Sequence, residues 1–190
     1  MLMQFLRDDN CIVLDFLPRG HSTGRQEPIA QVLGNKYFSL LEVIIKRDVT
    51  VKNEDVIYIG EGKRGEVDHI KRRITVRDLT TFARSELPFV IERLVKNEEQ
   101  RFVDFFNKAQ PISTRLHQLE LLPGVGKKHM WDIIEDRKSN GPFKSFEDIK
   151  KRIKLMPDPA NTLVKRILEE LENESVRYRL FVSGPQRRFP

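Results

Sequence analysis

The spacing of apolar positions along the chain changes near Thr75. Before this point, short apolar and β-branched runs are separated by Gly, Pro and Asn, which is typical of strands. No helical period lies between the runs, so the pattern favours a small β-barrel of the OB type over a parallel sheet; a different small β-barrel remains the alternative. The expected strands cover residues 11–17, 28–33, 36–46, 55–60 and 65–75.

Residues 76–110 predict a helical linker that packs on the barrel. We expect one helix over 76–87 and a second from Pro88 to Gln110, because proline suits the first position of a helix. Apolar residues recur every three or four positions along the second helix and form a stripe that is typical of a packing face. Pro111 marks the expected boundary between the two halves.

Residues 111–176 predict only helices, arranged as an approximate internal repeat. Ser113 or Thr114 is the expected N-cap of a helix that ends at Leu121. A glycine turn then joins it to a partner helix over 127–138. These two helices form the first helix–turn–helix pair.

The second pair follows a break at residues 140–142. Ser145, with an acid three positions later, is the expected N-cap of a helix that ends near Ile153. A second turn at 155–160 leads into a last helix over 159–173. Two pairs of similar size are therefore expected side by side.

The turn Leu122-Pro123-Gly124-Val125-Gly126-Lys127-Lys128 carries the most informative chemistry. Its two glycines can adopt φ > 0 or let another backbone approach closely. The helix that begins near Lys127 has no Ser, Thr, Asp or Asn as its N-cap, so its first N–H groups lack a side-chain partner. Open N–H groups, the positive end of a helix dipole and two lysines together form a seat for a phosphate.

We expect four backbone N–H groups of this turn, those of residues 124–127, to converge on one phosphate, while Lys127 and Lys128 add charge. The alternative to phosphate binding is that the turn only connects two helices tightly and that its lysines are solvated surface residues. The predicted nucleic-acid-binding residues are Pro123, Gly124, Val125, Gly126, Lys127 and Lys128.

The second turn departs from this pattern, because Asp158 and Ala160 stand where the first turn has glycines. Asp158 followed by Pro159 fits the N-cap and the first position of a helix. A carboxylate there would satisfy the N–H groups itself and repel a phosphate, so we expect a structural turn or at most a weak site. The basic residues that would support such a weak site are Lys154, Lys165 and Arg166.

The first turn matches the helix-hairpin-helix motif, which holds nucleic-acid phosphates mainly through backbone N–H groups without reading sequence. The wider string, from Phe105-Phe106-Asn107 through Pro111-Ile112-Ser113 to Pro142-Phe143-Lys144, resembles an uncharacterised archaeal family of predicted RNA-binding proteins. The resemblance covers most of the chain. It implies an OB-like barrel joined to tandem helix-hairpin-helix motifs, and RNA in preference to DNA, although the hairpin is used on DNA at least as often.

The formal net charge is +6, and most of the excess lies in the half that carries the glycine turn. Residues 111–190 hold 16 lysines and arginines against 11 acids, whereas residues 1–110 hold 18 against 17. A basic balance suits an acidic partner without requiring one. The tail, residues 177–190, could add phosphate contacts or could be disordered.

A second basic candidate lies in the expected barrel. Aromatic residues beside it could stack on bases if they face outward, although filling the core is their commoner role. The basic residues are Lys63, Arg64, Lys71, Arg72 and Arg73, and the aromatic ones are Tyr37, Phe38 and Tyr58.

The remaining chemistry favours a protein that is not an enzyme. Cys11 lies in an apolar run, which indicates a small buried side chain rather than a nucleophile. The four histidines lack the spacing of a metal site, and the acids show no cluster suited to two metal ions. The sequence also has no Walker loop. We therefore expect no metal and no cofactor. No apolar run is long enough to cross a membrane, and we expect a cytoplasmic protein.

The sequence thus predicts an α+β protein with an OB-like barrel (1–75), a helical linker (76–110), a tandem helix-hairpin-helix module (111–176) and a basic tail (177–190). The expected partner is RNA or DNA, gripped through its backbone. The alternatives are a DNA-binding repair or processing accessory protein, a protein–protein scaffold, and a nuclease subunit whose active site comes from another chain.

Overall fold

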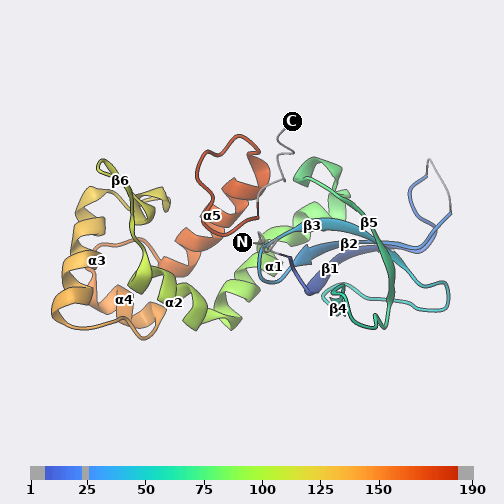
Figure 1. The fold of residues 1–190 in the computed structure, drawn as a ribbon, viewed down its shortest axis with the longest axis horizontal. Helices are drawn as coiled ribbons and strands as arrows, with labels where there is room; N and C mark the ends of the chain where they lie inside the picture. The colour runs from blue at the N-terminus through green and yellow to red at the C-terminus, as the bar shows by residue number, and fades with distance from the viewer. Residues whose placement is uncertain (1–6, 23–25, 184–190) are drawn as a thin grey trace, which may run out of the picture. The chain divides into compact units, whose positions relative to one another are not determined.

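The computed structural model describes residues 7–22 and 26–183 (Figure 1). It is a mixed α+β fold with a curled five-stranded antiparallel sheet and five α-helices in these residues. The described chain forms two compact units: residues up to Val90 together with those from Glu170 onward, and residues Ile91–Glu169. The elements are β1 (Asn10–Leu17), β2 (Ile29–Gly34), β3 (Leu40–Ile45), β4 (Val56–Tyr58), β5 (Val67–Arg73), η1 (Val76–Asp78), α1 (Thr81–Asn97), α2 (Glu99–Lys108), β6 (Pro111–Ser113), β7 (Leu116–His117), η2 (Gln118–Leu121), α3 (Lys127–Ser139), α4 (Phe146–Arg152) and α5 (Pro159–Glu172).

The sheet of the first unit has the strand order β4-β1-β2-β3-β5 and curls into a half-barrel (Figure 1). The strands occur where the apolar runs predicted them, although β3 begins only at Leu40 because Phe38 adopts φ +53°. Register shifts at Val13/Asp15 in β1 and between β3 and β5 mark bulges, which increase local twist. β4 and β5 are the edges of the sheet, so no ladder closes it into a barrel among the described residues.

The inner face of the sheet forms a continuous apolar core. Cys11 is fully buried there beside Val13, Val32 and Val43, which confirms its expected role as a small apolar side chain. Burial and the nearby charge of Asp8 raise the pKa of the Cys11 thiol far above its usual range. A buried thiol that stays protonated is a poor nucleophile.

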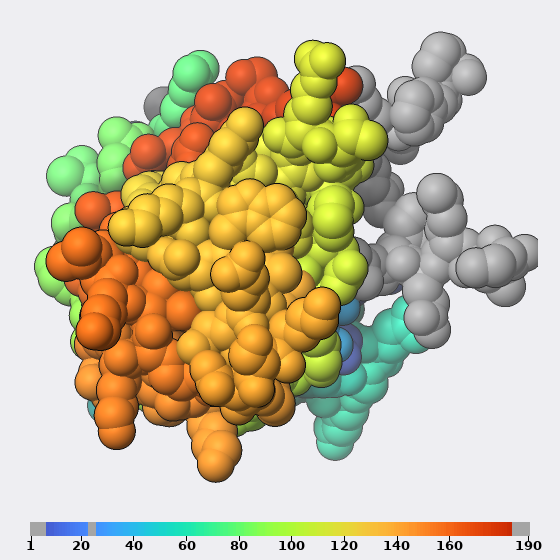
Figure 2. All heavy atoms as spheres, turned by 90° about the vertical axis from the view of Figure 1, so that its left-hand side faces the viewer, coloured from blue at the N-terminus to red at the C-terminus, as the bar shows by residue number. Residues whose placement is uncertain are grey.

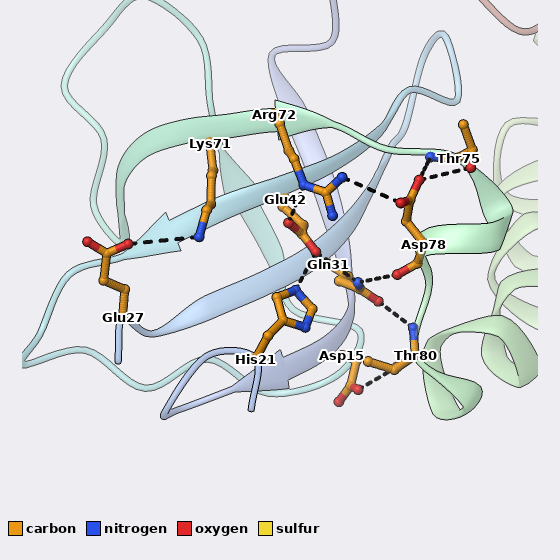
Figure 3. A network of polar contacts seen from close by, with 10 residues as sticks. All are labelled: Asp15, His21, Glu27, Gln31, Glu42, Lys71, Arg72, Thr75, Asp78 and Thr80. Carbon is orange, nitrogen blue, oxygen red and sulfur yellow. Dashed lines mark hydrogen bonds and ion pairs between the residues drawn. The ribbon is translucent and has the colours of Figure 1, made fainter. Parts of the chain in front are cut away.

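Polar side chains at the same sheet form a connected network around the buried carboxylate of Glu42 (Figure 3). Glu42 lies 2.7 Å from Nε2 of His21 and accepts hydrogen bonds from Gln31 Nε2 (3.1 Å) and Arg72 Nε (2.8 Å). Burial alone would raise the pKa of Glu42, but these contacts outweigh it and the pKa is lowered. Gln31 also accepts from the N–H of Thr80 at 2.8 Å, so the network ties the sheet to the start of α1.

The segment after α5 is packed in the first unit, which corrects the expectation of a tail beginning at residue 177. The carboxylate of Glu170 is fully buried and accepts from the backbone N–H groups of Leu180, Phe181 and Val182 at 2.7–3.0 Å. Ser183 then donates its N–H to the carbonyl of Tyr37 at 3.0 Å. Three N–H groups on one carboxylate fix the path of this segment. Arg187 and Arg188 lie outside the described residues.

Pro88 lies inside α1 instead of starting a second helix, so the expected break at this position is wrong. Its missing N–H removes one hydrogen bond, which a helix of 17 residues can lose without ending. The break occurs at Glu98, whose φ of −103° and ψ of 34° are not helical.

No α-helix covers residues 113–121, which corrects the expected first arm of the hairpin. β6 and β7 form a two-stranded ladder, and the 3₁₀ helix η2 follows. Pro111 favours extended backbone, and His117 caps η2 by accepting from the N–H of Leu119 at 3.1 Å. The side chain of Glu120 accepts from the N–H of His117 at 2.8 Å and completes a capping box.

The break at residues 140–142 is held by Arg152 in α4. Its guanidinium donates to the carbonyl of Gly141 at 2.7 Å and to the carboxylate of Asp136 in α3, and lies over the ring of Phe143 at 4.2 Å. The predicted cap at Ser145 is confirmed, because its Oγ accepts from the N–H of Asp148 at 3.0 Å. The core of this unit includes the buried residues Phe102, Phe106, Leu119, Ile133, Phe143, Ile149, Leu163 and Ile167.

Candidate nucleic-acid interface

The first turn, residues 122–126, is closed by hydrogen bonds of its own backbone. The N–H of Leu122 donates to the carbonyl of Leu119 at 3.1 Å, and the N–H of Val125 donates to the carbonyl of Leu122 at 3.0 Å. The side chain of Val125 is buried. The N–H of Val125 is therefore already used within the turn, in contrast to the expectation that it points toward a phosphate.

Gly124 is required by the fold itself. Its φ of +81° lies in the left-handed region, which residues with a Cβ resist. A Cβ at this position would also lie 2.9 Å from Cγ of Pro157, which belongs to the second turn. The two turns thus contact each other through Gly124 and Pro157, and this glycine has a structural explanation.

Gly126 has no such explanation. It is the N-cap of α3, with φ −85° and ψ −178°, a conformation open to any residue. A Cβ at Gly126 would meet no atom of the described residues within 4 Å. Neither left-handed backbone nor close packing requires glycine here, so the open space beside it is available to a ligand.

The start of α3 leaves backbone donors open. Its first hydrogen bond joins the N–H of Met130 to the carbonyl of Gly126 at 3.0 Å, and no side chain caps it. Within the part of the chain that the structure describes, the N–H groups of Gly126, Lys127 and Lys128 have no hydrogen-bond partner. Both lysine side chains are exposed, so charge and open donors lie at the same helix end. Such an end favours an anion.

The second turn is closed by its own carboxylate, as the sequence predicts. Asp158 Oδ1 accepts from the N–H of Asn161 at 2.9 Å, and α5 begins at Pro159. Asp158 Oδ2 lies 2.8 Å from Nζ of Lys150. Burial would raise the pKa of Asp158, but Lys150 and the backbone N–H groups of Asn161 and Ala160 outweigh it and lower the pKa. The carboxylate is thus ionised and occupies the place that a phosphate would need.

The secondary basic residues of this unit are only partly brought to the first turn. Lys154 and Lys128 line the same groove, about 550 Å³ in volume, which also contains Asp132, Glu135 and Asp136. Lys165 is exposed, whereas Arg166 is buried and lies 3.0 Å from Glu169. Arg166 is consequently a structural residue. Figure 2 shows the face of this unit on which α3 and α4 lie.

The basic residues of the sheet are mostly engaged by the protein. Arg72 pairs with Glu42, Lys71 lies 3.9 Å from Glu27, and Arg73 donates to the carbonyl of Ser183 at 2.7 Å. Arg64 donates to the carbonyl of Gly60 at 3.0 Å, and Lys63 is exposed. Among the possible stacking residues, Phe38 is fully buried and cannot meet a base, while Tyr37 and Tyr58 are half-buried.

The role of His117 as an N-cap was not predicted from the sequence. His117 is buried at the start of η2, and burial together with the charge of Arg137 lowers its pKa, against the opposing effect of Glu120. The pattern in the sequence that could have indicated this cap is a His followed three residues later by Glu, although His is an uncommon N-cap. Its role is to set the path into the first turn.

No group of three or more His, Cys, Asp or Glu side chains suited to a metal occurs in residues 7–22 and 26–183. None of the helices in those same residues has the length and apolar character needed to cross a membrane.

Comparison with known proteins places the chain in a family. The model of a protein family of unknown function, DUF655, matches residues 7–183. The uncharacterised protein MJ0038 of Methanocaldococcus jannaschii is 46% identical over 171 residues, which are 90% of this chain and 77% of that protein. The crystal structure of Af1531 from Archaeoglobus fulgidus has 49% identity and a TM-score of 0.83, over 93% of this chain and 100% of that one. The chain therefore belongs to the DUF655 family, which has archaeal members of uncharacterised function.

Proposed function

We propose that this protein binds the phosphate backbone of a nucleic acid, RNA in the first instance, through the uncapped start of α3, without catalysing a reaction. The first turn and the β6–β7 segment before it would act as a helix-hairpin-helix-like element in which η2 takes the place of the first helix. The half-barrel sheet would be an OB-like domain. RNA is placed before DNA because of the family resemblance.

The observation that carries this proposal is Gly126. A glycine that neither its φ nor its neighbours require, at the N-cap of a helix of 13 residues, leaves room for a ligand to reach the backbone. The N–H groups of Gly126, Lys127 and Lys128 would donate to phosphate oxygens, and the two lysine side chains would add charge. These contacts do not touch base edges, so binding would be weakly selective for sequence.

The contrast with Asp158 supports the same interpretation. Both turns end at the start of a helix, yet only one start is satisfied by a side chain of its own. The ionised carboxylate at the second turn would repel a phosphate. The protein would therefore bind one nucleic-acid strand, at the first turn.

A second candidate function is docking of a protein partner on the same unit. It is favoured by two large apolar side chains near the first turn, because Trp131 in α3 is 56% exposed and Leu155 is 87% exposed. Leu155 lines the groove that also contains Lys128. Apolar docking would depend little on salt, whereas phosphate binding depends on it steeply.

Fluorescence anisotropy of the whole protein would test the proposal. The labelled ligands are single-stranded RNA, a hairpin RNA, single-stranded DNA and duplex DNA, each titrated at low and at near-physiological salt. We expect at least one ligand to bind, with an affinity that falls about tenfold or more between the two conditions. Absence of binding to all four ligands at low salt would refute the proposal.

A further inference from the structure

The first unit contains a cavity of about 250 Å³ that the proposed function does not use. Strands and loops of the sheet form one wall through Phe38, Leu40 and Ile74, and the segment after α5 contributes Val182. Leu171 near the end of α5 adds a further apolar surface. All five side chains are at most 9% exposed, so the body of the cavity is apolar.

The walls of this cavity are fixed before any ligand arrives. The carboxylate of Glu170 holds the N–H groups of Leu180, Phe181 and Val182, and the N–H of Ser183 is bonded to the sheet. A wall set by several hydrogen bonds does not have to be ordered on binding. A preformed apolar cavity with a few polar groups is the usual form of a small-molecule site.

Two arginines line the cavity, Arg73 and Arg179. Arg179 donates to the carbonyl of Glu170 at 2.7 Å, and its other partners in the described chain are also carbonyl oxygens, those of Asn173 and Glu174. Neutral carbonyls orient a guanidinium without cancelling its charge. Arg73 donates to the carbonyl and to Oγ of Ser183 at 2.7 and 2.8 Å, which holds its guanidinium at the cavity.

The two guanidinium groups are close enough to influence each other. Desolvation lowers the pKa of Arg73, the carboxylate of Asp8 opposes that effect, and the charge of Arg179 lowers the pKa further. Asp8 itself is committed to the N–H groups of Lys36 and Tyr37, and also to that of Ser39. Glu174 is the acid that lines the cavity. An anion between the arginines would relieve their mutual repulsion.

We propose that this cavity binds a small organic anion, with its carboxylate or phosphate between Arg73 and Arg179 and a compact apolar body against Phe38, Leu40 and Ile74. Arginine suits such a head group because its planar fork matches two oxygens at once. The volume is below the range of roughly 300–1,000 Å³ that is common for drug-sized ligands, so a single ring is the expected size. This site is independent of the first turn.

Chemical-shift titration of the whole protein with three probes tests the inference. Phenylacetate carries a carboxylate, phenyl phosphate carries a phosphate, and benzyl alcohol has a similar body without charge. We expect saturable shifts of the methyl groups of Leu40, Ile74, Leu171 and Val182 with at least one anion, bound about tenfold or more tightly than benzyl alcohol. The tighter of the two anions identifies the head group. Absence of saturation with both anions, or equal affinity for the neutral probe, would overturn the proposal.

Two variants separate charge from packing. Arg179→Gln removes the charge and keeps a shorter polar side chain, and we expect affinity for the anion to fall about tenfold. Arg179→Lys keeps the charge and is the matched control, with a loss of about threefold. The amide shifts of Leu180–Val182 report whether the wall is intact in each variant. Wild-type affinity in Arg179→Gln would contradict the proposed contact, and the comparison among the three probes on the wild-type protein needs no variant.

Discussion

The two turns of the second unit occupy equivalent places in the sequence repeat but differ in how they treat the N–H groups at the start of the following helix. These groups have no partner within the helix. At the second turn Asp158 satisfies them with its own carboxylate, whereas at the first turn Gly126 has no side chain and leaves the donors open. A closed helix start contributes stability, and an open one is available to a ligand.

The comparison also separates the two glycines of the first turn. Gly124 has a structural role, because its backbone is left-handed and Pro157 of the second turn packs against it. A Cβ at Gly126, by contrast, would contact none of the described residues. Equal letters in a motif thus carry different physical roles, and the fold and the proposed function depend on different ones.

The largest expected effect is that of Gly124→Ala on stability. The variant combines a left-handed φ with a clash against Pro157, and we expect a loss of about 2–3 kcal/mol in the free energy of unfolding. Gly141→Ala is the matched control, because Gly141 also has a positive φ, +80°, but open space around it, and should lose only about 1 kcal/mol. Urea unfolding measures both. Equal losses would show that Pro157 is not the constraint.

The next effect is that of Asp158→Ala, which removes the cap of α5 and the contact with Lys150. We expect a loss of about 1–2 kcal/mol near neutral pH. Asp158→Asn keeps the acceptor and should lose less. The folded pKa of Asp158 is lowered, so its stabilisation is present above the unfolded value of about 3.9 and is lost as the pH falls through the folded value.

The pH dependence sharpens that second prediction. Urea unfolding at about pH 7 and about pH 2.5 should show that the difference in free energy of unfolding between wild type and Asp158→Ala is smaller at the acidic value. A difference of the same size at both values would mean that the ionised carboxylate is not what caps α5.

The smallest stability effect has the opposite sign. Gly126→Asp would give α3 the same kind of cap as α5, with a negative charge at the positive end of the helix, and we expect a gain of about 0.5 kcal/mol. Gly126→Asn, which caps without charge, should gain slightly less. A clear loss of stability in both variants would show that Gly126 is needed by the fold after all.

Much of the fold follows from local sequence patterns. The five strands coincide with the apolar runs, and Ser145 and Asp158 cap the helices that they precede. These features depend on neighbouring residues alone. The roles of Gly124 and Gly126 required the structure, because the left-handed φ of Gly124 and its contact with Pro157, 33 residues further on, distinguish the two glycines.

The missed features depend on long-range contacts or on unusual local chemistry. Pro88 is tolerated inside a long helix, and His117 replaces a conventional cap, so the expected helix ending at Leu121 is reduced to η2. The segment after α5 is ordered by Glu170, a partner that no local pattern indicates. Burial decided the case of Phe38, which periodicity left open.

One measurement tests the central claim most directly: the affinity of Gly126→Asp for the nucleic acid that binds the wild-type protein best. The matched control is Ser139→Asp, which adds the same charge at the other end of α3, about 20 Å away. We predict that Gly126→Asp, folded and at least as stable as wild type, loses about tenfold or more in affinity, while Ser139→Asp loses about threefold or less. Wild-type affinity in Gly126→Asp, or equal losses in both variants, would contradict binding at the open start of α3.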